Sequence, residues 1–419
     1  MPDLILPHGG VAAPVNRTVP DNEAAAFRNR IPCATAIPVS DADLATLYRI
    51  ADGGLSPLTG PMSKAEYEQV LDEEVIVRGG KKYAWTIPLA FPVSEELAKT
   101  LTPGTTYGLK TERDQVVGTL ALTDVYPWDK VKYNASVYAT PRTDHPGARI
   151  ANSDPRTYLV GGEVQVLSAP RHPQYGDLIL SPVETRRLFA EKGYQRVVAF
   201  QTRNALHRAH EYALVTGLER LTREGHFTGA VLNPLVGETK ADDVDAVTRM
   251  KTYRALIDNK VLGQGDIDEE LWAKVGRPFS DHVHLLGLDI KMFYAGPKEA
   301  VMHAIYRQNF GFTDIVIGRK HADAPYDDKG EIWDGLAAHR KFDELKGELL
   351  IHPVKVGFAA FFAEVGKVAL VENCPKEWKP VSISGSDLRS QLGRGELPDP
   401  RILRPETAQV LIEKYRSAS

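Results

Sequence analysis

The stretch QTRNALHRAH, residues 201–210, places Arg203, Asn204, His207 and His210 between the apolar run RVVAF and a segment with helical periodicity. An arginine carries a planar fork of N–H donors that suits a tetrahedral oxyanion. The two histidines are three residues apart, so they share one face of a helix. This cluster predicts a site for a phosphate chain or a similar anion. A simple capping or surface pair of histidines is the alternative that the spacing alone leaves open.

A second polar cluster follows a later apolar run, in IVIGRKHADAP at residues 315–325. Gly318 allows a ligand to approach the backbone closely, Arg319 and Lys320 supply positive charge, and His321 supplies a further donor. Taken singly, this segment has the composition of a solvated loop. Two such loops at the ends of strands in one sheet are expected to converge on one ligand.

The elements that must position these loops change in character near residue 170. Before it, β-rich runs at 82–91, 115–126 and 157–167 are separated by turn residues and interrupted by one helical pattern at 63–74, which predicts a small sheet or barrel. After it, apolar strands alternate with helices, and this alternation predicts a doubly wound parallel sheet. Ligands of such sheets bind beyond the carboxyl ends of the strands.

The helix that follows the first cluster has its apolar positions at Ala213, Leu214, Gly217, Leu218 and Leu221. This face is expected to pack on the sheet, and the helix is expected to begin near His207. Its free N–H groups and positive dipole end then face the mouth of the strands, where they favour an anion.

Length and composition limit the remaining possibilities. The chain has 419 residues, of which 43% are hydrophobic and 25% charged, with a formal net charge of −4. We expect three parts, at 1–170, 171–328 and 329–419. The charge gives no bulk preference for nucleic acid or an anionic membrane. Cys33 and Cys374 make no disulfide framework, and the sequence shows neither a signal-peptide pattern nor a long apolar run, so we expect a cytoplasmic protein.

Three segments resemble the signatures of the ATP sulfurylase (sulfate adenylyltransferase) family: QTRNALHRAH, GRKHAD at 318–323 and ISGSDLR at 383–389. NPLVGETKADD at 233–243 and MFYAGPKEA at 292–300 are further similarities, and the resemblance extends over essentially the whole chain. It implies a PUA-like β-rich barrel, a Rossmann-like α/β catalytic domain and a small C-terminal α/β subdomain. It also implies reversible transfer of AMP from MgATP to sulfate, which yields adenosine 5′-phosphosulfate (APS) and pyrophosphate.

The resemblance also assigns roles to residues. Thr202, Arg203, Asn204, His207 and His210 match the catalytic positions. Gln201 and Arg203 match the sulfate-binding side chains, together with the backbone of Ala322. The nucleotide-binding positions are Gln201, Asn204, His207, His210, Gly318, Arg319, Lys320 and His321, with Ala359 on a looser match. Magnesium is expected to arrive with the nucleotide, and the enzyme is expected to form a homo-oligomer, with a dimer favoured.

This sequence departs from the family pattern at several positions. Ala205 replaces a proline, and Lys320 and Asp323 replace an aspartate and a glycine. Some bacterial members carry a zinc site of three cysteines and a histidine, but here only Cys374 stands in that region, so we expect no zinc. Because the sequence ends at Ser419, we also expect no appended APS-kinase-like domain.

Other conspicuous residues favour structural roles. We expect His282 and His284 to pack rather than to bind metal, and Ser384 or Ser386 to cap a short helix. Gly311 is expected to end a helix. The segment KADDVD, 240–245, is expected to be a loop and helix start, with a mobile flap as the alternative.

Two other functions stay open at this point. One is an adenylyltransferase that uses another phosphate or oxyanion acceptor. The other is a non-catalytic nucleotide-binding or RNA-binding module.

Overall fold

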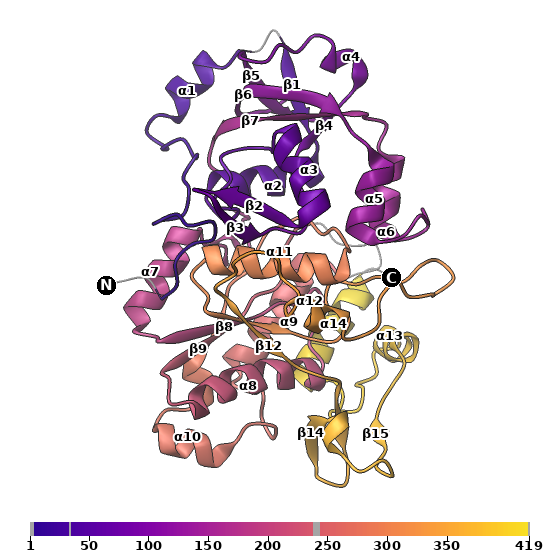
Figure 1. Ribbon diagram of the computed structural model, residues 1–419. Helices are drawn as coiled ribbons and strands as arrows, with labels where there is room; N and C mark the ends of the chain where they lie inside the picture. The colour runs from indigo at the N-terminus through magenta and orange to yellow at the C-terminus, as the bar shows by residue number, and fades with distance from the viewer. Residues whose placement is uncertain (1–3, 33–34, 238–243, 418–419) are drawn as a thin grey trace.

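The N-terminal part of the chain folds around a five-stranded sheet with the order β1-β5-β6-β7-β4 (Figure 1). The computed structural model describes residues 4–32, 35–237 and 244–417. The strands are β1 (Ala36–Val39), β4 (Phe91–Val93), β5 (Thr106–Thr111), β6 (Val116–Pro127) and β7 (Tyr158–Val166). The edge strands β1 and β4 contact each other, so the sheet curls into a nearly closed barrel. A hairpin of β2 (Val75–Arg78) and β3 (Lys81–Ala84) lies beside it.

More helices surround this barrel than the single one that the sequence predicted. The predicted helix is α3 (Lys64–Glu73), and the others are α1 (Ala24–Arg30), α2 (Asp41–Ala51), α4 (Glu95–Ala98), α5 (Lys130–Tyr138) and α6 (Pro146–Ser153). The prediction of one helix is therefore wrong. The clearest omission is α2, where the Ser40 hydroxyl accepts the N–H of Asp43 while Leu47 and Ile50 are fully buried. Helices this short are stabilised mainly by tertiary packing, which a local pattern does not reveal.

The second part of the chain is built on a parallel sheet with the order β10-β9-β8-β11-β12. Its strands are β8 (Arg196–Phe200), β9 (Thr228–Leu232), β10 (Val283–Leu285), β11 (Asp314–Ile317) and β12 (His352–Lys355). Chain order runs outward from β8 to β10, then returns through α11 (Gly296–Asn309) to β11 on the other side of β8. The sheet therefore changes winding direction between β8 and β11, and the predicted α/β fold is confirmed. The remaining helices are α7 (Pro182–Lys192), α8 (Arg208–Arg223), α9 (Ala246–Asp258), α10 (Glu269–Val275) and α12 (Ala337–Lys341).

Alternate side chains of the central strands enter two different cores. Val198 and Val316 join Leu214 and Leu218 of α8 in one buried cluster. A Cβ at Gly217 would lie 2.9 Å from Val316, so the glycine allows α8 to approach the sheet closely. The apolar face predicted for this helix is thus confirmed. On the other face, Val197, Ala199, Ile315 and Ile317 pack with residues of α11, including Ala300 and Ala304.

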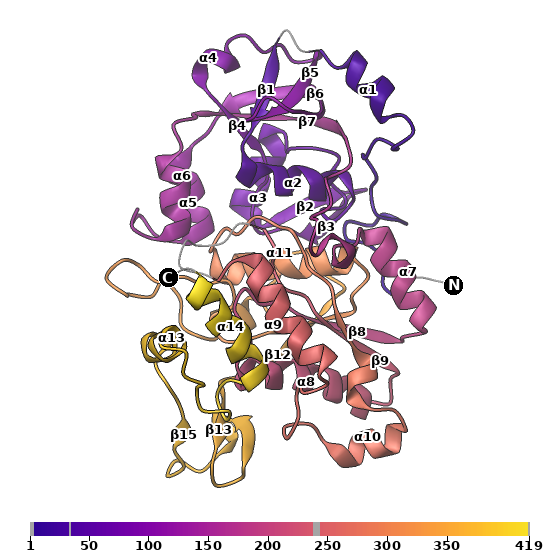
Figure 2. The same cartoon turned by 180° about the vertical axis from the view of Figure 1, so that it is seen from behind.

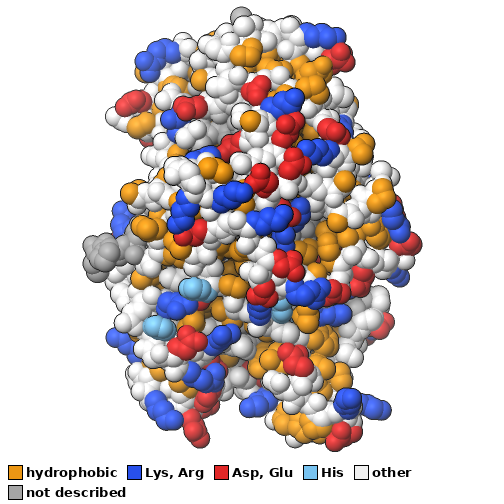
Figure 3. Space-filling model, viewed as in Figure 1, with side chains coloured by type: hydrophobic (Ala, Val, Ile, Leu, Met, Phe, Trp, Pro, Cys, Tyr) orange, Lys and Arg blue, Asp and Glu red, His pale blue; other side chains and the backbone are white. Residues whose placement is uncertain are grey.

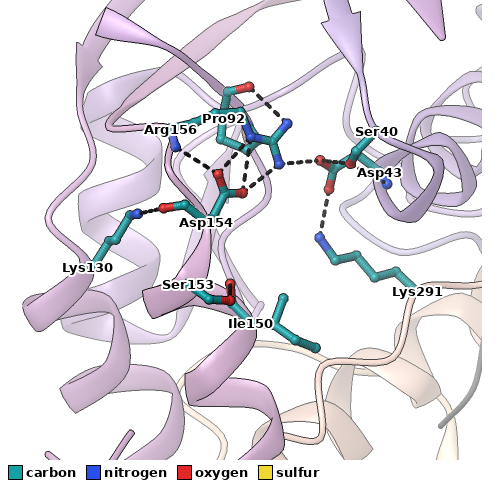
Figure 4. A network of polar contacts seen from close by, with 9 residues as sticks. All are labelled: Ser40, Asp43, Pro92, Lys130, Ile150, Ser153, Asp154, Arg156 and Lys291. Atoms are coloured by element: carbon teal, nitrogen blue, oxygen red, sulfur yellow. Dashed lines mark hydrogen bonds and ion pairs between the residues drawn. The ribbon is translucent and has the colours of Figure 1, made fainter. Parts of the chain in front are cut away.

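Helix α11 also packs against the N-terminal barrel (Figures 1 and 2). Asn309, at its carboxyl end, donates from Nδ2 to the carbonyls of Gly54 and Ser56, at 3.0 and 3.1 Å. Figure 4 shows a further junction, where Lys291 of the second part pairs with Asp43 of α2 at 2.7 Å. Arg156 lies 3.6 Å from the same carboxylate and holds Asp154 at 2.5 Å. The two parts therefore share one buried core and a network of charged contacts.

The C-terminal part adds a small antiparallel sheet and two helices. The sheet has the order β14-β13-β15, from β13 (Ala359–Phe362), β14 (Lys367–Leu370) and β15 (Pro380–Val381). Helices α13 (Gly385–Gly393) and α14 (Pro405–Ser417) follow, and α14 packs against α9 (Figure 2). The division that the sequence suggested at residue 328 cuts through the parallel sheet, because β12 pairs with β11.

The surface carries both signs of charge. On the face shown in Figure 3, acidic and basic side chains are interspersed, in keeping with the small net charge of −4. Among the described residues, we find no helix with both the length and the apolar character needed to cross a bilayer.

Candidate active site

The change of winding direction brings the two polar clusters of the sequence to the same edge of the sheet. Strand β8 ends at Phe200 and β11 ends at Ile317, and the two strands are hydrogen-bonded neighbours. Residues 201–207 and 318–324 are the loops that leave them. A doubly wound sheet has its natural crevice at such a switch point, because the loops on either side diverge.

The loop after β8 is fixed by its own polar groups. The Thr202 hydroxyl donates to the Asn204 carbonyl and accepts the Asn204 N–H, both at 3.1 Å. Tyr253 of α9 donates to the same carbonyl at 2.7 Å, and Arg249 donates from Nη1 to the Arg203 carbonyl at 2.7 Å. Helix α9 thus holds the backbone between β8 and α8 in place, while Asn204 stays exposed.

The first turn of α8 presents the two predicted histidines together. His207 is the N-cap residue, as the sequence predicted, and its ring stacks on that of His210 with 3.7 Å between centroids. Burial lowers the pKa of His207 to about 4, and burial together with the neighbouring His207 holds the pKa of His210 well below its ordinary value. Both rings are therefore neutral near pH 7 in the free protein.

The backbone of this turn is less open to an anion than expected. The N–H of Arg208 donates to the Ile402 carbonyl at 2.9 Å, and the N–H of His210 donates to the His207 carbonyl at 2.8 Å. Arg404 also binds Glu211 of α8 at 2.7 Å, so the segment before α14 closes over the start of the helix. Side chains rather than helix N–H groups consequently carry most of the donor capacity here.

Contacts between side chains connect the two loops through α11. Gln201 Nε2 lies 3.5 Å from Nε2 of His303, and Nδ1 of His303 lies 3.1 Å from Nε2 of His321. Arg203 reaches across from the first loop, with Nη2 donating to the Asp323 carbonyl at 3.4 Å. Its guanidinium lies over the ring of Tyr294, 5.2 Å from the centroid.

Several buried polar atoms near these loops have no partner within the described part of the chain. Four are arginine donors: Nη1 of Arg203, Nε and Nη2 of Arg249, and Nη2 of Arg307. Oε1 of Gln201 and Nδ1 of His210 are also buried without a hydrogen-bond partner among the described residues. Buried donors are almost always hydrogen-bonded in native proteins, so the four arginine donors indicate a ligand rich in acceptors. An oxyanion has that character.

The loop after β11 has a backbone suited to close turns. Lys320 and Ala322 have φ values of 52° and 56°, and the Ala322 carbonyl accepts the N–H of Gly296 at 3.1 Å. A Cβ at Gly318 would meet nothing within 4 Å, so the space beside it is open. Burial raises the pKa of Asp323 to about 6, against the lowering influence of Lys320 and Arg203.

The two basic side chains of this loop contact protein neighbours. Arg319 lies over the Phe358 ring, 5.6 Å from its centroid, and Lys320 forms an ion pair with Glu331. Ala359 is buried on β13, in a cluster against which Ala209 and Tyr212 of α8 pack. The segment of Ala359 thus lies against the helix that carries the histidine pair.

The sequence predictions missed a set of polar residues on α11. Glu299, His303 and Arg307 recur at intervals of four and are all essentially buried. Burial lowers the pKa of Arg307 to about 9, and its Nε donates to Asn233 at 2.9 Å. The signal was present, because three ionisable residues at intervals of four on one face of a helix are unusual in a core.

The remaining predictions about single residues agree with the structure where it describes them. His282 bonds to the Thr228 carbonyl at 2.8 Å and His284 to the Tyr194 hydroxyl at 2.6 Å, so both pack. Ser384 caps α13, and Gly311 follows the end of α11 with a φ of 93°.

Two of these predictions fall partly on residues outside the described ranges. In KADDVD, Asp245 caps α9, whereas residues 240–243 lie outside the described residues. Cys33 lies outside them too. Within the described ranges, no group of three His, Cys, Asp or Glu side chains is arranged to hold a metal ion.

Comparison with known proteins gives a consistent result over the whole chain. The ATP-sulfurylase family model matches residues 176–414, and a PUA-like domain model matches residues 5–169. A sulfate adenylyltransferase of Pyropia yezoensis is 52% identical over 415 residues, which cover 97% of this chain and 96% of that protein. A sulfate adenylyltransferase of Synechococcus sp. (strain JA-3-3Ab) is 35% identical over 416 residues, covering 99% and 97%.

A solved structure supports the fold. The structure described as a hexameric APS kinase from Thiobacillus denitrificans superimposes with a TM-score of 0.71, at 19% identity, over 98% of this chain and 68% of that chain. The PUA-like character expected of the N-terminal barrel is confirmed by the domain match.

Proposed function

Because the chain belongs to the ATP sulfurylase family and has sulfate adenylyltransferase activity, we propose that the two loops at the switch point form its active site. ATP and sulfate are the substrates, and adenosine 5′-phosphosulfate and pyrophosphate are the products. In this proposal Gln201, Arg203 and the Ala322 backbone hold sulfate. Thr202 and Asn204 fix the loop, and Gly318, Arg319, Lys320 and His321 receive the nucleotide, with Ala359 beside it.

The reaction needs charge stabilisation rather than a base. A sulfate oxygen attacks the α-phosphorus of ATP and forms a new P–O bond, while the bond from the α-phosphorus to the α,β-bridging oxygen breaks and pyrophosphate leaves with that oxygen. Sulfate is already fully deprotonated, so no proton has to be removed. The protein must hold two mutually repelling anions in line and stabilise the charge that develops on the phosphoryl oxygens.

The histidine pair suits the second task. His207 and His210 are stacked at the mouth of the sheet, and the buried Nδ1 of His210 has no partner in the part of the chain that the structure describes. Since both rings are neutral in the free protein, each offers one N–H donor, and an approaching phosphate favours their protonation. Magnesium enters with ATP as part of the substrate, coordinated by phosphates and water.

The observation that carries this proposal is the group of unpartnered arginine donors around the first loop. Arg203 is central, because its buried Nη1 has no acceptor among the described residues and its Nη2 makes only a long contact to a carbonyl. We also propose a homodimer located in the cytoplasm. The scarcity of cysteine supports that compartment.

Exchange of labelled pyrophosphate into ATP tests the reaction. We expect exchange only when sulfate and magnesium are both present, since the reverse reaction must pass through adenosine 5′-phosphosulfate. Exchange without sulfate, or exchange supported only by an organic phosphate acceptor, would contradict the proposed oxyanion site. Omission of the enzyme and a Gln201→Ala variant serve as controls.

A further inference from the structure

A buried chain of polar contacts on α11 lies directly beneath the proposed sulfate pocket. Glu299 and His303 are both 1% exposed and stand one helical turn apart. His303 Nε2 lies 3.4 Å from Oε1 of Glu299 and 3.5 Å from Nε2 of Gln201, while its Nδ1 faces His321. His303 therefore contacts both substrate loops from below.

Glu299 controls the backbone that supports Arg203. Its Oε1 accepts the N–H of Phe293 at 2.8 Å, and its Oε2 accepts the N–H of Ala295 at 2.9 Å. Between these two bonds Tyr294 is held at a φ of 57°, in the left-handed region. Burial raises the pKa of Glu299 to about 7. A tyrosine in the left-handed region costs about 1 kcal/mol or more, so the two hydrogen bonds to Glu299 maintain a strained geometry. The ring placed in this way lies under the Arg203 guanidinium.

A neutral His303 ring carries one N–H proton, and three groups lie near its two nitrogens: Glu299, Gln201 and His321. The pKa of His303 lies well below the ordinary value because of burial and of the nearby Arg307 and Arg203, so the ring is neutral. When the proton lies on Nε2, which is 3.4 Å from Oε1 of Glu299, Nδ1 can accept from His321, and the Gln201 amide nitrogen finds no acceptor on His303. That nitrogen is then free for an anion, which can only accept hydrogen bonds.

We propose that Glu299 and His303 are positioning residues for the sulfate site. Glu299 positions the Arg203 guanidinium through Tyr294, and His303 positions the Gln201 amide through its ring. This inference rests on the proposed sulfate site. Neither residue touches substrate. A buried carboxylate and histidine are weak sources of stability compared with apolar side chains, which favours a role in geometry over one in folding.

The test separates the two substrates. We expect Glu299→Gln and His303→Asn each to raise the KM for sulfate about 10-fold, the effect of one lost hydrogen bond, with the KM for MgATP changed less than about twofold. Glu219→Gln and His282→Asn are matched controls. Glu219, farther along α8, is a buried carboxylate that accepts the backbone N–H of Asp268 and the indole N–H of Trp272. His282 is a buried histidine bonded to the Thr228 carbonyl. Both controls should leave both KM values unchanged.

A double-mutant comparison shows whether His303 acts through Gln201. In a Gln201→Ala background, His303→Asn should change the KM for sulfate by less than about twofold, because the two residues share one function. Full additivity, equal changes in both KM values, or a normal KM for sulfate in both single variants would overturn the proposal. If one variant does not fold, as judged by circular dichroism, the other carries the test.

The same experiments distinguish the two levels of inference. If Gln201→Ala and Arg203→Lys leave sulfate kinetics unchanged, the proposed sulfate site is wrong. If they impair sulfate kinetics while Glu299→Gln and His303→Asn do not, the sulfate site stands and only the positioning role is refuted.

Discussion

Replacement of Arg203 by lysine tests the proposed site most directly. Within the described residues two of its donor nitrogens are little used: Nη1 is buried without an acceptor, and Nη2 makes one contact of 3.4 Å to a carbonyl. Arg203→Lys keeps the positive charge but removes the planar fork, so sulfate loses one or two charge-assisted hydrogen bonds. Each bond lost costs about 1.5–3 kcal/mol, which corresponds to roughly a 10-fold to 150-fold fall in kcat/KM for sulfate per bond.

The assay is the initial rate of pyrophosphate release, first against sulfate at saturating MgATP and then against MgATP at saturating sulfate. We expect the loss in the first series, with the KM for MgATP within about twofold of the wild type. Arg196→Lys is the matched control, because Arg196 lies at the opposite end of β8 and pairs with Asp314 at 2.6 Å. The reasoning is refuted if Arg203→Lys keeps normal kcat/KM for sulfate, or if the control loses as much.

Three further predictions follow from the described contacts. His207→Ala and His210→Ala should each lower kcat about 100-fold in steady-state assays, the scale for one preorganised donor, and near-normal rates would disprove their role. Burial lowers the pKa of His8 to about 4 in the folded state, below its ordinary 6.5. The free energy of unfolding should therefore fall as pH drops from about 6.5 towards 4, by about 2 kcal/mol at pH 5 for this histidine. Urea titrations should show a smaller pH-dependent loss for His8→Gln, and an equal loss would argue against the buried neutral ring. Removal of magnesium by a chelator should abolish activity until magnesium is restored. Elemental analysis should find no zinc, and Cys374→Ser should be as stable as the wild type. Bound zinc would contradict the expectation that Cys374 holds no metal.

The sequence predicted the catalytic core well, because its signals are local. The N-cap at His207 and the apolar face of α8 depend on residues within one helix. The loops after β8 and β11 follow from strand periodicity and the rules of parallel sheets.

The network on α11 depends instead on which groups the fold brings together, over short separations for Glu299 and a long one for His303. Glu299 bonds to the backbone of Phe293 and Ala295, and His303 meets Gln201, about a hundred residues earlier in the chain. The left-handed geometry of Tyr294 is likewise imposed by neighbours rather than by its own preference. Such features emerge only when the elements are brought together.

The hydrogen bond from the Arg208 N–H to the Ile402 carbonyl has a consequence for biosynthesis. The first turn of α8 is completed by a segment made nearly two hundred residues later, which also supplies Arg404 as the partner of Glu211. On the ribosome the parallel sheet can form early, but the catalytic turn stays unfinished until that segment emerges from the exit tunnel. Newly made chains should therefore acquire nucleotide affinity late in translation, after most of their core has already folded.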